Sequence, residues 1–478
     1  MDYTLQVPNA TSAGQLAVTS PYDGRHVGSV EIVDLAGVDH ALKNATACFD
    51  DKNNWLPADR RINILRKMAV LMEENYQRIV DQAVAEGGKP VVDTRIEMDR
   101  AIDGILNCIE CIRGNAGHEI PMRLNPASAN RIAFTHKEPI GVVVAVSAFN
   151  HPINLIVHQI GPAIASGCPV IIKPASDTPL SAFLLADLFK QAGLPEGWCQ
   201  AVMTDSNETA QALVTDQRVD FFSFIGSAKI GWMLKSKLSA GTRCALEHGG
   251  AAPVVIAEDA DLDDIMPLLA KAGFYHAGQV CVSVQRIFAH HRIAREVAER
   301  LAELGNNMQV GDPADKNTDI GPLIRHRETD RIEQWVNEAV EEGAELISGG
   351  KRINDALYQS TVLFEPKEHS KVRQLEVFAP VVCVNSYTEL DDAIHSANAV
   401  PYSFQAAVVS KNIDTAMYAF KHLNASAVMI NDHTAFRVDW MPFAGLKQSG
   451  YGVGGIPYTF NEMQIEKLAV LRSTALGG

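Results

Sequence analysis

The sequence predicts an α/β protein built on two parallel sheets, and three observations support this prediction. Short β-rich apolar runs alternate with helical segments along most of the chain. Alternation of this kind requires crossover helices between parallel strands. The 478 residues exceed what one hydrophobic core usually supports, and the alternation resumes after residue 284, so a second α/β domain is expected.

The elements follow in order along the chain. Residues 16–32 place a Pro-Tyr-Asp-Gly turn between two alternating runs, which predicts a hairpin. Apolar residues at helical spacing predict helices over 35–49 and 59–86. The polar, alternating stretch 123–137 interrupts the pattern and predicts a hairpin that leaves its domain to pair with another subunit.

The alternating units come next. Buried-type strands are expected over 142–146, 169–173, 221–225, 253–257, 284–289, 381–386, 406–409 and 428–430. Helices are expected over 180–192, from 228, and over 262–277, 294–307 and 328–342. The glycine-rich segment 445–455 is expected to be an ordered loop.

Composition excludes several classes of protein. The chain has 42 Lys and Arg residues and 57 Asp and Glu residues, so its formal net charge is −15. Because an acidic surface repels a phosphate backbone, a nucleic-acid partner is not expected. The amino terminus lacks a basic and apolar leader, and no apolar run reaches the ~18 residues of a membrane span, so a cytoplasmic protein is expected. Eight scattered cysteines do not resemble a disulfide scaffold, and Cys108 and Cys111 are interpreted as helix residues, so no metal site is predicted.

Two segments could hold a phosphorylated ligand. Gly226 and Ser227 lie between a strand and a helix, where free amides and the helix dipole attract phosphate. The usual G-x-G-x-x-G pattern is absent, so a plain tight turn remains open. Lys173 ends a strand and Ser176 follows it, a position suited to ribose or phosphate, although these residues taken alone favour a solvated lysine before a turn.

A cysteine and a glutamate are the candidate catalytic pair. Cys281 lies in a loop between a helix and a strand, where a thiol can act as a nucleophile. Glu247 stands between an apolar residue and His248-Gly249-Gly250, which suits a general base with a raised pKa. Either residue alone could be structural, and His248 could be a hydrogen-bonded structural histidine or a group that tunes Glu247.

Together these residues resemble the aldehyde dehydrogenase family along nearly the whole chain. The matching motifs occur in the family's order, and the separation of Glu247 from Cys281, 281 minus 247 or 34, also matches. They are Glu138-Pro-Ile-Gly-Val, Phe149-Asn-His-Pro, Lys173-Pro-Ala-Ser, Phe224-Ile-Gly-Ser, Leu246-Glu-His-Gly-Gly, Gly278-Gln-Val-Cys, Glu376-Val-Phe-Ala-Pro and Pro442-Phe-Ala-Gly-Leu-Lys-Gln-Ser-Gly.

The resemblance implies a chemistry. Cys281 would attack the aldehyde, and Asn150 with the Cys281 amide would donate to the thiohemiacetal oxygen. After hydride transfer, Glu247 would activate the water that hydrolyses the thioester to an acid. Relatives that pass the acyl group to coenzyme A can lack this glutamate. A coenzyme A-acylating semialdehyde dehydrogenase and a non-catalytic structural homologue are the alternatives.

The resemblance also implies NAD or NADP as the cofactor. The implied contacts are Lys173 and Ser176 with the adenosine ribose, Phe149 nearby, Gly226 and Ser227 with the pyrophosphate, and Glu376 and Phe378 with the nicotinamide end. Many NAD-specific relatives carry a glutamate where Ser176 stands, so we expect use of both cofactors or a preference for NADP.

For the substrate, the motifs resemble the branch of lactaldehyde and phosphonoacetaldehyde dehydrogenases. That branch implies a small polar or anionic aldehyde. Arg437 falls near the aldehyde funnel and could bind an anionic tail, or could instead pair with Asp439 or with another surface carboxylate. Phe436 and His151 are the other candidate substrate contacts.

The fold that the resemblance implies has two Rossmann-like parallel-sheet domains plus a small β oligomerisation element. The cofactor-binding domain is expected over 1–121 and 140–248, and the catalytic domain over 249–448. The oligomerisation element is expected over 122–139 and 459–478, where the hairpin and the strand 467–471 extend a neighbour's sheet in a homodimer or homotetramer.

Overall fold

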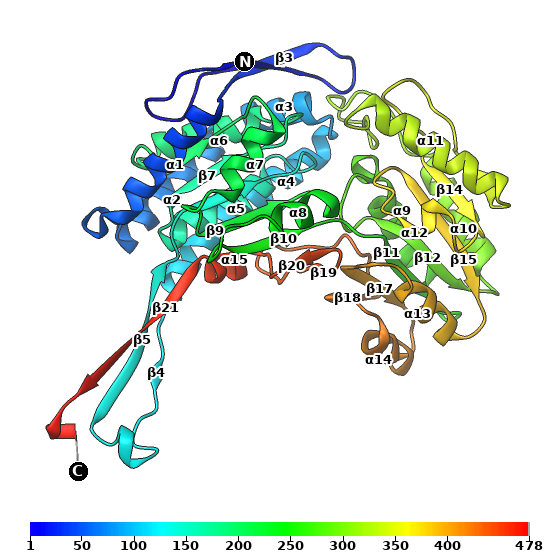
Figure 1. Cartoon of the computed structure of the whole chain (residues 1–478). Coiled ribbons are helices and arrows are strands. Elements are labelled where there is room, and N and C mark those ends of the chain that lie inside the picture. The colour runs from blue at the N-terminus through cyan, green and yellow to red at the C-terminus, as the bar shows by residue number, and fades with distance from the viewer. Residues whose placement is uncertain (477–478) are drawn as a thin grey trace.

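The structure, a computed structural model, describes residues 1–476 and consists of two α/β bodies and a projecting arm (Figure 1). The sheet of the first body has the strand order β20-β10-β9-β6-β7-β8, and all but β20 are parallel. Its strands are β6 (Val143–Val146), β7 (Val170–Lys173), β8 (Cys199–Ala201), β9 (Phe221–Ile225), β10 (Arg243–Glu247) and β20 (Gly450–Tyr451). Its helices are α1 (Leu35–Asp50), α2 (Ala58–Glu74), α3 (Tyr76–Gly87), α4 (Val91–Arg113), α5 (Asn154–Ser166), α6 (Leu180–Gln191), α7 (Asn207–Thr215), α8 (Ala228–Lys235) and α15 (Ile456–Glu462).

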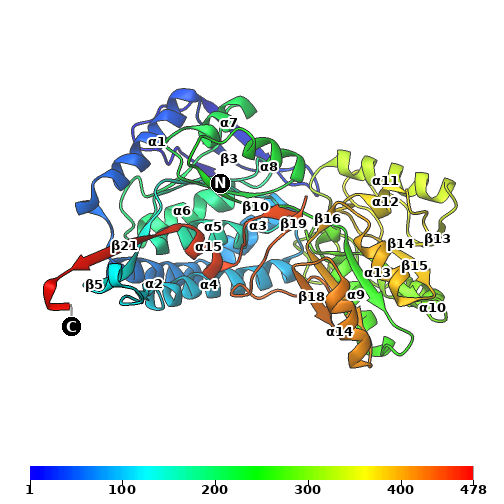
Figure 2. The same cartoon turned by 60° about the horizontal axis from the view of Figure 1, so that its bottom comes forward.

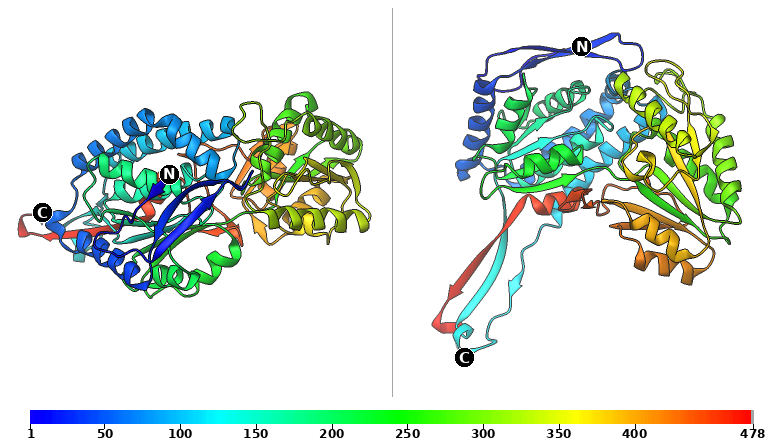
Figure 3. Two further views of the ribbon diagram at one scale, coloured as in Figure 1. Left: turned by 90° about the horizontal axis from the view of Figure 1, so that it is seen from above. Right: turned by 45° about the vertical axis from the view of Figure 1, so that its right-hand side comes forward.

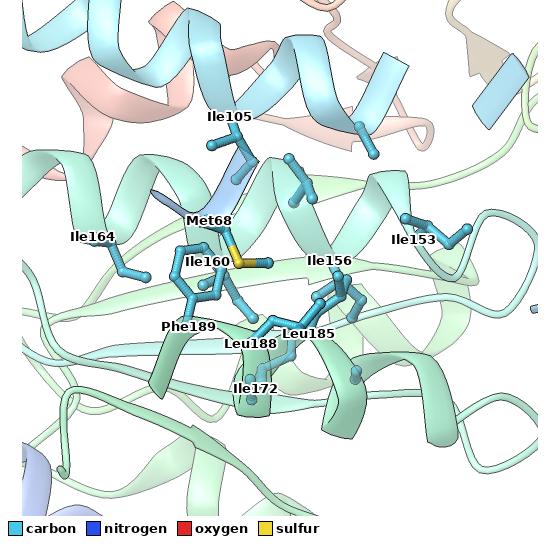
Figure 4. Packing of buried hydrophobic residues seen from close by; sticks show 14 of the residues in the cluster. Met68, Ile105, Ile153, Ile156, Ile160, Ile164, Ile172, Leu185, Leu188 and Phe189 are labelled. Atoms are coloured by element: carbon cyan, nitrogen blue, oxygen red, sulfur yellow. The ribbon is translucent and has the colours of Figure 1, made fainter. Parts of the chain in front are cut away.

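Apolar side chains of the helices fill the first body. Figure 4 shows Met68 of α2, Ile105 of α4, Ile160 of α5 and Leu188 of α6 packed above Ile172 of β7. All five are fully buried or nearly so, and each such side chain contributes about 1.5–3 kcal/mol through removal from water. This core holds α5 in place, and the first turn of α5 lies at the cavity between the two bodies.

The second body has a seven-stranded sheet in the order β13-β14-β15-β12-β11-β17-β18, with only β13 antiparallel. Its strands are β11 (Ala252–Ile256), β12 (Val284–His290), β13 (Glu345–Ser348), β14 (Thr361–Phe364), β15 (Val381–Tyr387), β17 (Gln405–Val409) and β18 (Ala427–Ile430). Its helices are α9 (Leu262–Phe274), α10 (Ala294–Asn306), α11 (His326–Glu341), α12 (Lys371–Gln374), α13 (Leu390–Asn398) and α14 (Ile413–His422). A short pair, β16 (Tyr402–Ser403) and β19 (Leu446–Lys447), joins the bodies (Figure 2).

The arrangement of the strands predicts where a ligand binds. In the first sheet, β7 and β8 extend one side of β6, whereas β9 and β10 extend the other. This reversal opens a crevice at the carboxyl ends of β6 and β9, the usual ligand position in such sheets. The loop that precedes β12 lies at the opposite, amino-terminal end of the second sheet. The site therefore forms between the two bodies.

A narrow antiparallel arm projects from the first body (Figures 1 and 3). It consists of β4 (Glu119–Ile120), β5 (Arg131–Pro139) and β21 (Gln464–Arg472), with β21 paired to β5 along its full length. At the other end of the body, β2 (Gly14–Thr19) and β3 (His26–Ile32) form the predicted hairpin, to which β1 (Asp2–Tyr3) adds in parallel. Within residues 1–476, no helix combines the length and apolar character needed to cross a membrane.

Three predicted elements differ from the structure. The helix expected over 59–86 breaks at Asn75, whose side-chain amide donates to the Leu71 carbonyl and caps α2. The helix expected over 262–277 ends at Phe274, because His276 and Ala277 adopt left-handed φ angles of 49° and 53°. Residues 459–462 were assigned to the oligomerisation element, yet they belong to α15, which packs on α4 and α5 in the first core.

Candidate active site

A cavity of about 860 Å³ lies between the two bodies. Side chains from the carboxyl ends of β6, β7, β9 and β10 line one side, and the loop before β12 and the start of α11 line the other. The cavity gathers every predicted site residue except Phe436: Phe149, Asn150, His151, Lys173, Ser176, Gly226, Ser227, Glu247, Cys281, Glu376, Phe378 and Arg437. Residues far apart in the chain thus meet in one place.

The loop that carries Cys281 is held in an unusual conformation. His276, Ala277 and Gly278 have successive φ angles of 49°, 53° and 68°. Glycine is required at the third position, because a Cβ there would lie 2.2 Å from the Ala379 carbonyl oxygen. Left-handed non-glycine residues persist only where surrounding contacts impose them, and they concentrate at functional sites.

Gln279 is the main anchor of this loop. Its Oε1 accepts from the Ile324 amide at 2.9 Å, and its Nε2 donates to the Pro322 carbonyl at 3.2 Å. Gln279 belongs to a matched motif, but nothing in its sequence context indicated this role. The contacts tie the cysteine loop to the segment that leads into α11.

Asn150 connects the cysteine loop to the first sheet. It follows β6, is 6% exposed, and donates from Nδ2 to the Gln279 carbonyl at 2.9 Å. A carboxamide has two N–H groups, so the second remains available to an oxygen in the cavity. The amide is therefore fixed in position before any ligand arrives.

Burial sets the protonation of the candidate catalytic pair. Removal from water raises the pKa of the Cys281 thiol, and the nearby Glu247 carboxylate raises it further, while Arg437 opposes both. Burial also raises the pKa of Glu247, and Arg437 opposes the rise. The thiol is therefore neutral at rest, and a base must take its proton before it can attack a carbon.

Glu247 itself is positioned by the carboxyl-terminal segment. It ends β10, where Gly450 of β20 lies opposite it in the antiparallel pair. A Cβ on Gly450 would lie 2.5 Å from the Leu246 carbonyl oxygen, so only glycine allows this approach. The segment 445–455 was predicted as a loop, but it contains the short strands β19 and β20, and the second of these packs against the end of β10.

His248 has a structural role. Its Nδ1 lies 2.8 Å from the Gly226 carbonyl oxygen, and its ring packs between Phe224 and Trp232. Gly231 of α8 leaves room for the ring, since a Cβ there would lie 2.0 Å from an imidazole carbon. The histidine therefore supports the turn from β9 into α8, in agreement with the structural interpretation.

The cofactor side of the cavity fits a dinucleotide. Within residues 1–476, Glu376 Oε1 is buried without a hydrogen-bond partner, and burial raises the pKa of this carboxyl to about 7. A Cβ on Gly249 would lie 1.4 Å from the same oxygen, so glycine preserves its space. Ser227 caps α8 without a side-chain bond, which leaves the first amides of the helix available to a phosphate. An unpartnered carboxylate at one end and free amides at the other match the ribose and pyrophosphate of NAD(P).

Lys173 completes the cofactor side. Burial lowers the pKa of its ammonium group to about 8, and among the described residues 1–476 Nζ donates only to the neighbouring Pro174 carbonyl, at 3.2 Å. Phe149 and Phe378 meet edge to face, with ring centroids 5.9 Å apart. These side chains form the floor of the crevice.

Arg437 does not pair with Asp439, so that alternative is wrong. Its guanidinium stacks on the Phe443 ring at 3.5 Å, and Nη1 lies 4.0 Å from Glu247 Oε1. The side chain is only 9% exposed, and its Nε has no partner within residues 1–476. A buried cation that is short of partners faces the catalytic pair.

Asp439 instead binds Arg100, a cavity residue that the sequence did not indicate. Arg100 Nη2 donates to Asp439 Oδ1 at 2.7 Å and Nε to Oδ2 at 3.1 Å. The same carboxylate lies 2.7 Å from His158 Nε2, and Arg437 Nη2 lies 3.4 Å from His158 Nδ1. Because 339 residues separate Arg100 from Asp439, no local pattern could reveal this pair.

The two remaining substrate candidates differ. His151 lines the cavity, and its Nε2 lies 3.4 Å from the Tyr275 hydroxyl. Phe436 is 43% exposed and is not among the residues that line the cavity, so its contact with the substrate stays a prediction. Its neighbours Ala435 and Arg437 face inward instead, and this turn directs Phe436 outward.

Comparison with known proteins identifies the family. The model of the aldehyde dehydrogenase family matches residues 8–468. The 3-sulfolactaldehyde dehydrogenase of Priestia megaterium is 37% identical over 462 residues, 96% of each chain. Aldehyde dehydrogenase 21 of Physcomitrella patens, solved with its reaction product succinate, superposes with a TM-score of 0.95 at 32% identity over 99% of this chain and 98% of that one. Glyceraldehyde-3-phosphate dehydrogenase of Methanocaldococcus jannaschii, solved with NADP, superposes with a TM-score of 0.91. The two chains are 31% identical, and the match covers 98% of this chain and 100% of that one. The chain therefore belongs to the aldehyde dehydrogenase family and is an NAD(P)-dependent enzyme that oxidises an aldehyde to a carboxylic acid.

Proposed function

We propose that this enzyme oxidises a small aldehyde with an anionic tail, and that Cys281, Glu247 and Asn150 carry out the chemistry. The observation that carries the proposal is the pair of arginines, Arg437 and Arg100, in the wall of the cavity that holds Cys281. Two guanidinium groups beside a neutral thiol favour a substrate that brings its own negative charge.

The catalytic residues act in sequence. Glu247 takes the proton of the Cys281 thiol, and the thiolate attacks the aldehyde carbon to give a thiohemiacetal. The second N–H of Asn150 and the Cys281 amide donate to the oxygen, and one such donor is worth roughly 3–4 kcal/mol in comparable sites. Bound NAD(P)+ supplies the hydride acceptor. Once Glu247 has passed the thiol proton to solvent, it takes a proton from the water that attacks the Cys281 thioester. The acid leaves, and this second proton restores the Cys281 thiol.

The cofactor contacts extend along the crevice. Lys173 and Ser176 bind the adenosine ribose, the α8 amides beyond Gly226 and Ser227 bind the pyrophosphate, and Glu376 accepts from the nicotinamide ribose. Phe149 and Phe378 pack against the cofactor from the two bodies. Ser176 places no charge at the ribose, which supports use of NADP as well as NAD.

Arg437 binds the anionic tail, assisted by Arg100 and with His151 lining the wall. Arg437 keeps unused N–H groups, whereas Arg100 shares its charge with Asp439. Two relatives support an anionic substrate: one is named for 3-sulfolactaldehyde, which carries a sulfonate, and the other was solved with succinate, a dicarboxylate.

A panel of aldehydes tests the proposal. Anionic and neutral aldehydes of equal size are compared with NAD or NADP, with and without coenzyme A, for the wild type and Arg437→Met. Methionine keeps the stem volume and removes the charge, so kcat/KM for anionic aldehydes should fall about 30- to 1,000-fold, equivalent to 2–4 kcal/mol, with little change for neutral ones. Equal losses for both sets would refute the anionic substrate, and dependence on coenzyme A would refute release of a free acid.

We also propose a homodimer or homotetramer in the cytoplasm. The strand β21 lies at the edge of the arm's sheet, and an open strand edge can extend a neighbour's sheet. Apolar side chains are exposed on both faces of the arm: Ile132, Phe134 and Leu471 on one face, and Leu468 and Val470 on the other. A reactive thiol at Cys281 requires a reducing compartment, which favours the cytoplasm. Light scattering of the wild type and of Leu468→Lys measures the assembly.

A further inference from the structure

An ion pair crosses the cofactor crevice. Asp177 follows β7 of the first body, and Arg325 caps α11 of the second. Arg325 Nε donates to Asp177 Oδ1 at 2.8 Å, and Nη2 donates to Oδ2, so the guanidinium and the carboxylate form a bidentate ion pair. Both side chains line the cavity together with Lys173 and Ser176.

The pair keeps capacity for a ligand. Arg325 is 41% exposed and Asp177 22% exposed, so the pair faces the open end of the cavity. Within residues 1–476, Arg325 Nη1 makes no hydrogen bond, and a guanidinium engaged on one edge has further N–H groups to offer. Ser176, which lines the same cavity, is an exposed residue.

The charges at this end determine which cofactor can enter. A 2′-phosphate carries about −1.5 to −2 charges, as other phosphate monoesters do, whereas the 2′-hydroxyl of NAD carries none. An unpaired Asp177 carboxylate next to Ser176 would repel the phosphate. The Arg325 guanidinium cancels that charge and adds donors of its own. Lys173 lines the same cavity, and Asp177 also acts electrostatically on its ammonium group.

We propose that Arg325 determines cofactor specificity: it neutralises Asp177 and donates to the 2′-phosphate of NADP from across the crevice. The inference rests on the proposed position of the adenosine ribose at Lys173 and Ser176. It assigns the second body a direct part in cofactor choice, although the other ribose contacts come from the first.

Binding of cofactor fragments to the full-length enzyme tests the inference without turnover. Calorimetric titration compares adenosine 2′,5′-bisphosphate with AMP, which lacks the 2′-phosphate. Arg325→Gln should raise the Kd of the bisphosphate about 10- to 150-fold, as expected when a hydrogen bond to a charged group is lost, and change that of AMP less than threefold. Asp177→Asn should leave the Kd of the bisphosphate unchanged or lower it, because the variant retains Arg325 and removes a carboxylate that repels the phosphate.

Two further variants separate the possible failures. In Arg325→Gln/Asp177→Asn the bisphosphate should bind more tightly than in Arg325→Gln alone. If Arg325→Gln and Asp177→Asn weaken both ligands equally, the pair only clamps the two bodies together and the specificity role is refuted. Lys173→Met should weaken both fragments; if it weakens neither, the proposed ribose position is wrong. Arg292→Gln, which breaks a surface pair with Glu258, is the matched control and should change nothing.

Discussion

A buried ion pair beside the active site supports a quantitative stability prediction. Glu97 of α4 accepts from Lys89 Nζ at 2.8 Å and from the amides of Ile153 and Asn154 at 2.8 and 2.9 Å. The side chains of Lys89 and Glu97 are 3% and 0% exposed. Glu97 therefore neutralises a buried cation and also satisfies the first amides of α5, three residues beyond Asn150.

Glu97→Gln should lower the free energy of unfolding by about 3–5 kcal/mol, because it leaves the Lys89 ammonium buried without a counter-ion. Lys89→Met should lower the free energy of unfolding by less than Glu97→Gln does, since two backbone amides at the start of α5 still stabilise the Glu97 carboxylate. The double variant should be more stable than Glu97→Gln alone. For a body of roughly 200 residues, 3–5 kcal/mol corresponds to a fall of about 6–20 °C in the thermal midpoint.

Scanning calorimetry of the three variants measures these differences. Glu299→Gln is the matched control, because Glu299 pairs with Arg295 on the surface with both side chains about half exposed, and such pairs contribute about 0–1 kcal/mol. If Glu97→Gln shifts the midpoint no more than this control does, the buried pair does not stabilise the fold as argued. Loss of kcat beyond the loss of stability would show that Glu97 also positions Asn150.

Three further predictions concern the site. Glu247→Gln should slow both the first formation of NAD(P)H and the later turnover about 10²-fold or more, because the same carboxylate deprotonates the thiol and activates the water. Full activity of this variant in both phases by stopped flow would remove Glu247 from the mechanism. Burial lowers the pKa of His158 to about 4, so its Nε2–H donates to Asp439 and Nδ1 accepts from Arg437. His158→Leu should therefore raise KM for anionic aldehydes about tenfold, whereas His158→Gln, which can both donate and accept, should not. Since burial raises the pKa of Glu376 to about 7 from 4.5, its protonated form favours the fold, and the ligand-free enzyme should lose up to about 3 kcal/mol as pH rises from 4.5 through 7. Thermal midpoints across that range should fall less for Glu376→Gln, and identical profiles would contradict the assignment.

The sequence predicted the parallel sheets because strands buried on both faces are continuous apolar runs. The expected strands over 142–146, 169–173 and 221–225 match β6, β7 and β9 to within one residue at each end. The helix over 262–277 was extended too far because the periodicity continues past Phe274, while contacts of the cysteine loop impose left-handed φ angles on His276 and Ala277. Local preference could not indicate that distant packing overrides it.

The candidate nucleophile, the candidate base and the proposed cofactor segments were indicated by the sequence, because their short motifs together resemble the aldehyde dehydrogenase family in order and spacing. Only the tertiary structure decided the charges around them. In the folded chain Asp439 forms an ion pair with Arg100, while Arg437 lies near Glu247. Phe436 lies outside the cavity, and Asp177 pairs with Arg325 across the crevice. The physical reason is that an ion pair depends on distance in space, and the two sheets bring together residues more than a hundred positions apart in the chain.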